Sequence, residues 1–244
     1  MVLCTKWLIL SIDLRLMVSE NVKNIRHRIQ SICERVKRNV DDIKIVAVTK
    51  TFSSQLASDA VRASILDLGE NYVQELLKKK EEIHDDKVRW HFIGHLQTNK
   101  VKLIAGRVDL IHSVDSLRLA VEISNFCSKI GKTQNILIEL NTSGETSKFG
   151  TDPDKALNLA KEVIMVPNIS LTGLMTIGKF SDNPEESRKD FTMLREVKEL
   201  IEKDGIALKH LSMGMSNDFE VAIEEGATII RLGTAIFGAR QYNN

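Results

Sequence analysis

The chain has 244 residues, of which 43% are hydrophobic and 27% are charged, a balance typical of globular proteins. Its 34 lysines and arginines nearly match its 33 acids, so the formal charge of +1 excludes a general attraction to nucleic acid or to anionic membranes. Three cysteines, at positions 4, 33 and 127, lack the CxxC spacing of metal or redox sites and favour a reducing, cytoplasmic location.

Residues 1–16 need a separate interpretation. The apolar segment 7–12 faintly resembles a signal peptide, but Asp13 and Arg15 interrupt it and no small-residue cleavage site follows. The segment is also too short to span a bilayer. We expect residues 1–16 to form a disordered or loosely packed extension, with Met17 as an alternative start, and residues 17–244 to form one domain.

From about residue 18 the chain alternates amphipathic and apolar segments. A helix is expected at roughly 18–38, another at 116–130 with Asp115 as its cap, and the clearest at 184–204, between Asn183 as cap and Gly205 as terminator. Eight short apolar runs are expected to be strands: 43–49, 65–68, 89–93, 109–113, 135–140, 169–176, 208–213 and 228–232.

Strict alternation of strands and helices requires parallel strands with right-handed crossovers. Eight such units predict a single α/β domain, a (β/α)8 TIM barrel with an extra N-terminal helix. A doubly wound open sheet is the alternative. No GxGxxG motif follows the first strand, which weakens that alternative and argues against a dinucleotide cofactor.

Lys50 stands where the first predicted strand ends. Active sites of barrels lie at the carboxyl ends of the strands. A lysine at that rim is partly desolvated, so the pKa of its amine falls and the amine becomes available for a Schiff base with an aldehyde. The alternative is a lysine that only marks the end of a strand.

Two polar loops predict an anion site opposite Lys50. Ser212-Met213-Gly214-Met215-Ser216 follows the seventh predicted strand, and Arg231-Leu232-Gly233-Thr234 ends the eighth. Loops in these positions commonly bind phosphate in barrels, because glycines let backbone N–H groups approach an anion and hydroxyls add donors. Each glycine alone could equally serve a turn.

A lysine and a phosphate site together are compatible with a phosphosugar enzyme or with a pyridoxal phosphate pocket. Arg231 favours the second, because a cation against the pyridine nitrogen is one of the known partners of that cofactor and disfavours transamination. The alternative for Arg231 is an internal ion pair with Glu139 or Glu70.

Other polar residues receive a structural interpretation. His91 alternates with apolar neighbours and is expected in the core, and His112 either shares the core or contacts a ligand. The run Lys78-Lys79-Lys80-Glu81-Glu82 predicts a solvated helix face and not a nucleic-acid surface. No set of His, Asp and Glu has metal-ligand spacing, so no metal is expected.

Seven motifs in register resemble the YggS/PROSC family of pyridoxal-phosphate-binding homeostasis proteins, which is similar in fold to the barrel domain of alanine racemase. The match runs from about residue 20 to residue 242. Its motifs are Ala47-Val48-Thr49-Lys50, Gly69-Glu70-Asn71-Tyr72-Val73-Gln74-Glu75, Trp90-His91-Phe92-Ile93-Gly94, Gln97-Thr98-Asn99-Lys100, Gly173-Leu174-Met175, Ser212-Met213-Gly214-Met215-Ser216 with Asp218, and Arg231-Leu232-Gly233-Thr234-Ala235-Ile236-Phe237-Gly238.

The resemblance implies that Lys50 holds pyridoxal 5'-phosphate as a Schiff base and that Arg231 faces the pyridine nitrogen. It further implies three groups of binding residues. Ser216, Gly233 and Thr234 would hold the phosphate, Asn71 would lie beside the ring, Ile93, Met175 and Met213 would pack the pocket, and Ser212 would add a polar contact. The implied role is cofactor homeostasis, with release or delivery to pyridoxal-phosphate-dependent apoenzymes, by a monomer or weak dimer without assigned catalytic residues.

A small amino-acid racemase is the alternative function. Two-base racemisation needs a second acid–base group opposite the lysine, which in alanine racemase is a tyrosine from a further β-domain of the neighbouring subunit. The chain ends shortly after the last predicted strand and is expected to lack such a domain. Its tyrosines are Tyr72, at the start of a predicted helix, and Tyr242, near the end of the chain.

Overall fold

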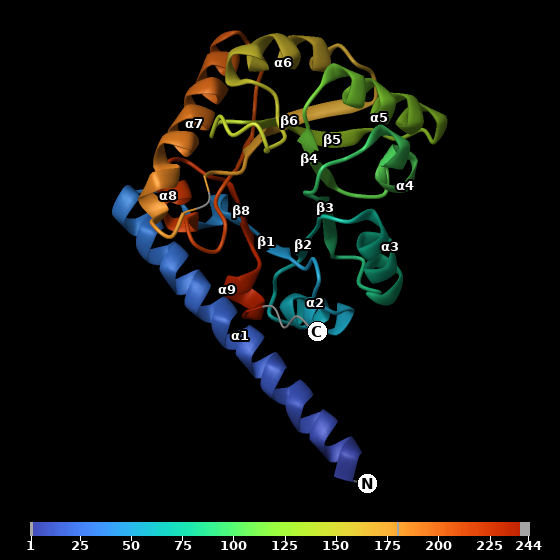
Figure 1. Cartoon of the computed structure of the whole chain (residues 1–244), viewed down its shortest axis with the longest axis vertical. Coiled ribbons are helices and arrows are strands. Elements are labelled where there is room, and N and C mark those ends of the chain that lie inside the picture. The colour runs from blue at the N-terminus through green and yellow to red at the C-terminus, as the bar shows by residue number, and fades with distance from the viewer. Residues whose placement is uncertain (1, 180, 240–244) are drawn as a thin grey trace.

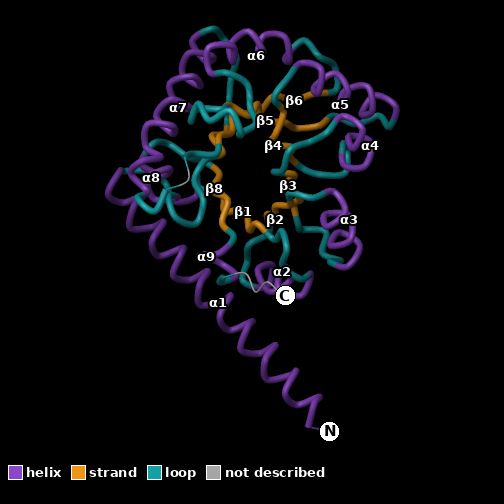
Figure 2. The backbone as a smooth tube through the Cα atoms, in the orientation of Figure 1, coloured by secondary structure: helices purple, strands orange, loops and turns teal. Residues whose placement is uncertain are grey.

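The computed structural model describes residues 2–179 and 181–239, and the side chains from Leu14 onward. Eight parallel strands close into a barrel in chain order, so the predicted (β/α)8 fold is confirmed and the open sheet is excluded (Figure 2). The strands are β1 (Lys44–Val48), β2 (Asp67–Glu70), β3 (Arg89–Phe92), β4 (Leu110–Val114), β5 (Gln134–Leu140), β6 (Ile169–Thr176), β7 (His210–Ser212) and β8 (Ile229–Leu232).

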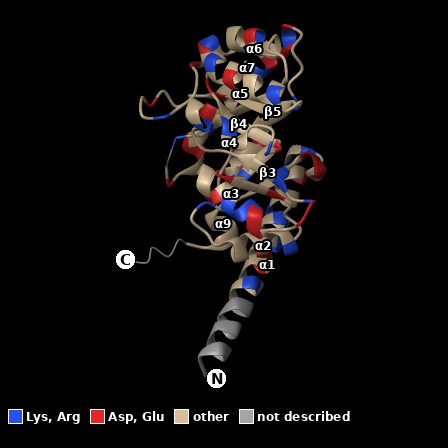
Figure 3. Ribbon diagram, turned by 90° about the vertical axis from the view of Figure 1, so that its right-hand side faces the viewer, with Lys and Arg blue, Asp and Glu red and all other residues tan. Residues whose placement is uncertain are grey.

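Helices surround the barrel on its outside (Figure 1). In the described part of the chain they are α1 (Val2–Val36), α2 (Ser54–Arg62), α3 (Val73–Glu82), α4 (Val101–Ile104), α5 (Leu117–Lys129), α6 (Ala156–Ile164), α7 (Arg188–Lys203), α8 (Phe219–Glu224) and α9 (Thr234–Phe237). Within these residues, no helix combines the length and the apolar character needed to cross a membrane. Acidic and basic residues are interspersed along the ribbon in Figure 3.

The first helix is longer than expected, since α1 begins at Val2 and not near residue 18. Its buried residues Val18, Val22, Ile25 and Ile29 recur at helical spacing and attach it to the barrel. The preceding part extends beyond the barrel (Figure 1), so residues 2–16 continue a helix where a disordered or loosely packed segment was expected. Their status as an extension of the domain stays a prediction.

The helix caps match the expectations with one exception. Asn183 accepts a hydrogen bond from the Glu185 amide at 3.2 Å and caps the 3₁₀ turn that leads into α7, and Gly205 follows that helix with φ +89°. The predicted cap of α5, Asp115, is wrong. Ser116 is the N-cap residue, and its hydroxyl donates to Asp115 at 3.0 Å.

The second strand lies two residues later than predicted. Ile65 is buried, but the backbone pairing with β1 starts at Asp67, which stands opposite Val46. The strand thus includes Gly69 and the charged Glu70, which hydropathy places outside a strand. Both fit because Gly69 lies close against Val46 and Glu70 finds a buried cation.

The core has an outer and an inner part. The outer part fills the space between strands and helices. The inner apolar cluster lies inside the barrel and contains Val46, Leu110, Leu137, Met175 and Ile229. Polar side chains share this interior: His112 on β4 hydrogen-bonds to Ser212 on β7, and these strands are not neighbours, so the bond crosses the barrel.

Candidate functional site

A cavity of about 330 Å³ opens at the carboxyl ends of the strands. Its wall is formed mainly by residues that follow β1, β2, β3, β6, β7 and β8. It includes seven of the ten residues expected from the sequence: Lys50, Asn71, Ile93, Ser216, Arg231, Gly233 and Thr234. Residues from one end of the chain to the other therefore meet at the predicted mouth of the barrel.

Three expected residues do not line the cavity. Met175, Ser212 and Met213 are fully buried, with no exposed surface. Met175 belongs to the inner apolar cluster, and Met213 packs in the outer core. They lie beneath or behind the cavity wall, where they support the residues that line it.

Seven further residues line the cavity without having been expected to bind a ligand: Val48, Ile177, Lys179, Ser181, Met215, Asn217 and Asp218. Two of them shape the loop after β7. Asp218 accepts the Met215 amide at 2.6 Å, and the Asn217 side chain donates to the Ser181 carbonyl at 2.9 Å. Asp218 and Met215 belong to a motif already recognised, which was the available signal. The contact to Ser181 required the fold.

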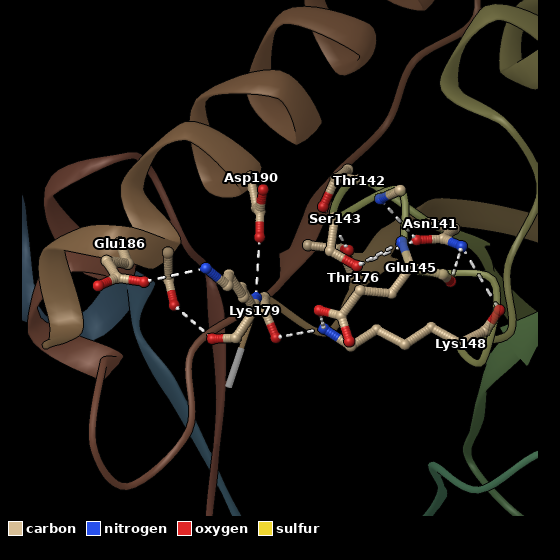
Figure 4. Close-up of polar contacts among 12 residues, drawn as sticks. Asn141, Thr142, Ser143, Glu145, Lys148, Thr176, Lys179, Glu186 and Asp190 are labelled. Carbon is tan, nitrogen blue, oxygen red and sulfur yellow. Dashed lines mark hydrogen bonds and ion pairs between the residues drawn. The ribbon is translucent and has the colours of Figure 1, made fainter. Parts of the chain in front are cut away.

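The loop after β6 contributes Lys179 to the cavity wall and is joined by polar contacts to the loop after β5 (Figure 4). The Lys179 amine pairs with Glu186 at 3.2 Å, and its backbone amide donates to Asp190 at 2.8 Å. The Lys148 amine pairs with Glu145 at 2.8 Å and donates to the Gly178 carbonyl at 3.1 Å. Lys148 thus joins the loop after β5 to the loop after β6, and Lys179 joins the loop after β6 to the start of α7 and the turn before it.

Lys50 follows β1 directly and is half-buried in the cavity wall. The backbone on both sides of it is anchored. The Thr49 carbonyl accepts a hydrogen bond from the Lys79 amine at 2.6 Å, and the Thr51 amide donates to Glu75 at 2.8 Å. Thr51 has φ +67°, a left-handed conformation that a threonine adopts only when its surroundings impose it.

Lys79 corrects the prediction of a solvated helix face. Its side chain is 5% exposed and pairs with the fully buried Glu70, as well as with Glu75 at 3.2 Å. Burial raises the pKa of Glu70, while hydrogen bonds from Lys79 and Thr49 oppose that rise. The neighbouring pair Lys78–Glu82, 3.9 Å apart, is exposed as expected. Local sequence could not separate Lys79 from its neighbours, because helix phase against the barrel decides which lysine turns inward.

The loops after β7 and β8 bring several donors together. The backbone amides of Gly233 and Ala235 point at the Ser216 hydroxyl oxygen, at 3.2 and 3.1 Å. A side chain at Gly233 would meet only Val48, at 3.5 Å or more, so the missing Cβ leaves room for a ligand. Amides and hydroxyls in this arrangement fit a phosphate.

Asn71 provides a second test of fit. Its Oδ1 atom is buried and has no hydrogen-bond partner, although a buried polar atom normally has one. Asn71 is held by close packing, since a Cβ at Gly94 would lie 2.2 Å from the Asn71 carbonyl oxygen. A hydrogen-bond donor on a ring-shaped ligand in the cavity would satisfy the side-chain Oδ1 atom of Asn71. The residues present therefore fit pyridoxal phosphate.

Arg231 forms the floor of the cavity and is 5% exposed. Its Nη1 atom donates to the Ser212 hydroxyl at 2.7 Å, and Nη2 donates to the Thr176 carbonyl at 2.8 Å. Burial lowers the pKa of Arg231 to about 10, although Asp218 and Glu139 raise it. Among the described residues neither Glu139 nor Glu70 forms a salt bridge with it, so the alternative of an internal ion pair is wrong.

The histidines of β3 and β4 lie below this floor. His91 is 1% exposed and bonds to Asp67 at 2.9 Å, which confirms its place in the core. His112 has no exposed surface and lies outside the cavity wall. In the part of the chain that the structure describes, no group of three His, Cys, Asp or Glu residues is arranged to hold a metal.

Comparison with known proteins identifies the family of this chain. The family model described as alanine racemase, N-terminal domain, matches residues 21–241. The pyridoxal phosphate homeostasis protein of Aquifex aeolicus is 45% identical over 224 residues, which cover 91% of this chain and 98% of that protein. The chain belongs to this family. The resemblance expected from the motifs is thereby confirmed.

Two solved structures show the same barrel. A structure described as an unknown protein from Bifidobacterium adolescentis has a TM-score of 0.87 at 35% identity, over 92% of this chain and 96% of its own. PipY of Synechococcus elongatus, solved with pyridoxal phosphate bound, has a TM-score of 0.80 at 28% identity, over 91% of this chain and all of its own. PipY thus shows that this fold accommodates the cofactor.

Proposed function

We propose that this protein binds pyridoxal 5'-phosphate through Lys50 and serves the homeostasis of that cofactor, holding it and releasing or delivering it. One observation carries the proposal. A lysine, an arginine, a cluster of amide and hydroxyl donors and an unpartnered amide oxygen converge on one cavity. The names of the relatives and the cofactor bound in PipY support the same conclusion.

Each residue has a distinct part in this proposal. The cofactor supplies an aldehyde that condenses with a primary amine, and the Lys50 amine must lose its proton to attack it. Ser216, Gly233 and Thr234 hold the phosphate, while Arg231 donates toward the pyridine nitrogen. Asn71 offers its buried oxygen to the ring. The phosphate contacts are non-covalent and remain when the lysine bond is broken, which suits reversible holding.

The racemase alternative lacks support at the cavity. Tyr72 is 55% exposed and absent from the cavity wall, and Tyr242 lies outside the described residues. No tyrosine of the described part therefore faces Lys50. A second acid–base group is what two-base proton exchange at an α-carbon requires.

The role in the cell forms part of the proposal. Pyridoxal-phosphate-dependent apoenzymes are the recipients, the protein acts as a monomer or weak dimer, and its location is the cytoplasm. Cys33 and Cys127 are buried and unpaired, as suits a reducing compartment. Sequestration is chemically useful because a free aldehyde reacts with lysines throughout the proteome.

Reduction of the loaded protein tests this function. We expect borohydride to fix one cofactor per chain on Lys50, as read from peptide masses, and Lys50→Ala to abolish the adduct while some phosphate-dependent binding persists. Lys179→Ala removes another lysine of the same cavity and should leave the adduct intact. Loaded wild-type protein should also restore activity to an apoenzyme. An adduct on Lys179, or one that survives Lys50→Ala, would refute the assignment.

A further inference from the structure

Four polar side chains form a connected line through the barrel interior. They come from four different strands, β2, β3, β4 and β7, and each is at most 4% exposed. Asp67 bonds to His91 at 2.9 Å, His91 to His112 at 2.9 Å, and His112 to Ser212 at 2.9 Å. The Ser212 hydroxyl then accepts a hydrogen bond from Arg231 at 2.7 Å. The line therefore runs from Asp67, at the amino end of β2, to the floor of the cavity.

The two ends of this line determine its direction when both imidazoles are neutral. A guanidinium only donates hydrogen bonds, and a carboxylate only accepts them. Arg231 therefore donates to the Ser212 oxygen, whose own hydrogen goes to Nδ1 of His112. Nε2 of His112 donates to Nδ1 of His91, and Nε2 of His91 donates to Asp67. With both imidazoles neutral, every bond has one hydrogen only when both rings are protonated on Nε2.

The electrostatics of His112 agree with a neutral ring. His112 is fully buried, and burial together with His91 and Arg231 lowers its pKa well below the usual value. Burial raises the pKa of Asp67, but hydrogen bonds from His91 and Arg89, together with the charges of His91 and Lys44, leave that pKa well below its usual range. A bidentate contact from Arg89, at 2.9 and 2.5 Å, also fixes the Asp67 carboxylate.

We propose that Asp67, His91, His112 and Ser212 are positioning residues, which act as one directional hydrogen-bond relay to orient the Arg231 guanidinium at the floor of the cofactor cavity. Ser212 accepts from Arg231 and donates to His112, so its hydroxyl serves Arg231 and not the cofactor. That the cavity binds pyridoxal phosphate rests on the proposed function. The relay itself belongs to the protein without any ligand.

The first test uses unmodified protein without cofactor. In long-range ¹H–¹⁵N correlation spectra of histidine-labelled protein, we expect the signals of both His91 and His112 to show a single neutral form protonated on Nε2. A form protonated on Nδ1, or a mixture of forms, at either residue would overturn the directional relay. Because no ligand is present, this outcome is independent of the proposed function.

The second test breaks the relay at a distance. His91→Phe removes a member that touches neither Arg231 nor the cavity, and Ser212→Ala removes the direct contact. In both variants we expect faster hydrogen exchange at the Arg231 guanidinium and about tenfold weaker pyridoxal phosphate binding, the effect of one hydrogen bond to a charged group. Ser212→Thr keeps the hydroxyl, so we expect it to keep the wild-type hydrogen exchange at Arg231 and the wild-type affinity for pyridoxal phosphate.

Matched controls separate the relay from general damage to the core. His210→Phe replaces a histidine at the same end of the barrel, bonded to Thr228 and not to the relay. Ser124→Ala removes a buried hydroxyl of α5, which bonds to Pro167. Both controls should leave Arg231 exchange unchanged. If His91→Phe also leaves hydrogen exchange at Arg231 unchanged, the relay is refuted. If the wild-type protein does not bind pyridoxal phosphate, only the proposed function is refuted.

Discussion

Glu139, at the end of β5, illustrates how one buried carboxyl group affects the stability of this fold. It is 5% exposed and lies outside salt-bridge distance of any described cation. Burial raises its pKa to about 7, although Arg231 opposes the rise. The folded protein therefore prefers the protonated form at pH values where the unfolded chain, with a pKa near 4.5, is already ionised. Glu139 thus contributes stability below pH 4.5 that is lost as the pH rises to about 7.

Glu139→Gln should remove this loss, because an amide does not ionise. We expect the variant and the wild type to be similar in stability at pH 5, and the variant to be more stable at pH 8 by up to about 3 kcal/mol. Urea unfolding at both pH values measures the difference. Glu122→Gln, on an exposed position of α5, is the matched control. A variant less stable than wild type at pH 8 contradicts the prediction.

At the scale of elements, α3 contributes to the site although only Asn71, just before it, lines the cavity. One face of α3 buries Val73, Leu76 and Lys79, three residues apart each time. The Lys79 amine reaches across to the Thr49 carbonyl of the neighbouring β1 segment. The orientation of Lys50 therefore depends on the packing of a helix that hydropathy alone presents as a polar surface helix.

Lys79→Met should uncouple this helix from the lysine. The substitution leaves Glu70 buried without its cation, which costs about 3–5 kcal/mol of unfolding free energy. We also expect slower formation of the Lys50 adduct, because the backbone at Thr49 loses an anchor. Lys78→Met, one residue earlier and exposed, should change stability by no more than about 0.5 kcal/mol. Adding Glu70→Gln to Lys79→Met should recover part of the loss, and no recovery would contradict the role of the ion pair.

At the scale of the whole molecule, the closed barrel makes one cavity from distant parts of the chain. Lys50 follows the first strand and Arg231 belongs to the last, and β1 and β8 pair directly where the sheet closes. A ligand that contacts both ends therefore favours the closed barrel over any partly open form. Binding to the folded state alone raises the unfolding free energy.

Thermal unfolding should report this coupling. With free pyridoxal phosphate at about 100 times Kd, we expect a gain of about 2.7 kcal/mol, which raises Tm by about 5–10 °C in a chain of this length. Lys50→Ala should show a smaller rise at the same cofactor concentration. Pyridoxine, which lacks both aldehyde and phosphate, should have no effect. An unchanged Tm with pyridoxal phosphate would exclude binding linked to folding.

The sequence pattern predicted most strands and helix ends of this protein well. The strand ending at Thr176 and the cap at Asn183 follow from hydropathy period and capping chemistry, which act over a few residues. The site residues Lys50, Asn71 and Arg231 could be named because they stand at strand ends, which a barrel gathers at one mouth. Predictions failed where helix phase or strand register decides, as at Lys79 and in β2.

The sequence by itself determined the order of strands and helices, the closed barrel and the residue types available at its mouth, because periodicity and chain-local chemistry carry that information. Only the tertiary structure decided which polar side chains became partners inside. His112 and Ser212 are 100 positions apart, and they meet because β4 and β7 face each other across the closed barrel. Interior space and hydrogen-bond satisfaction, which no local pattern encodes, therefore placed Ser212 beneath Arg231.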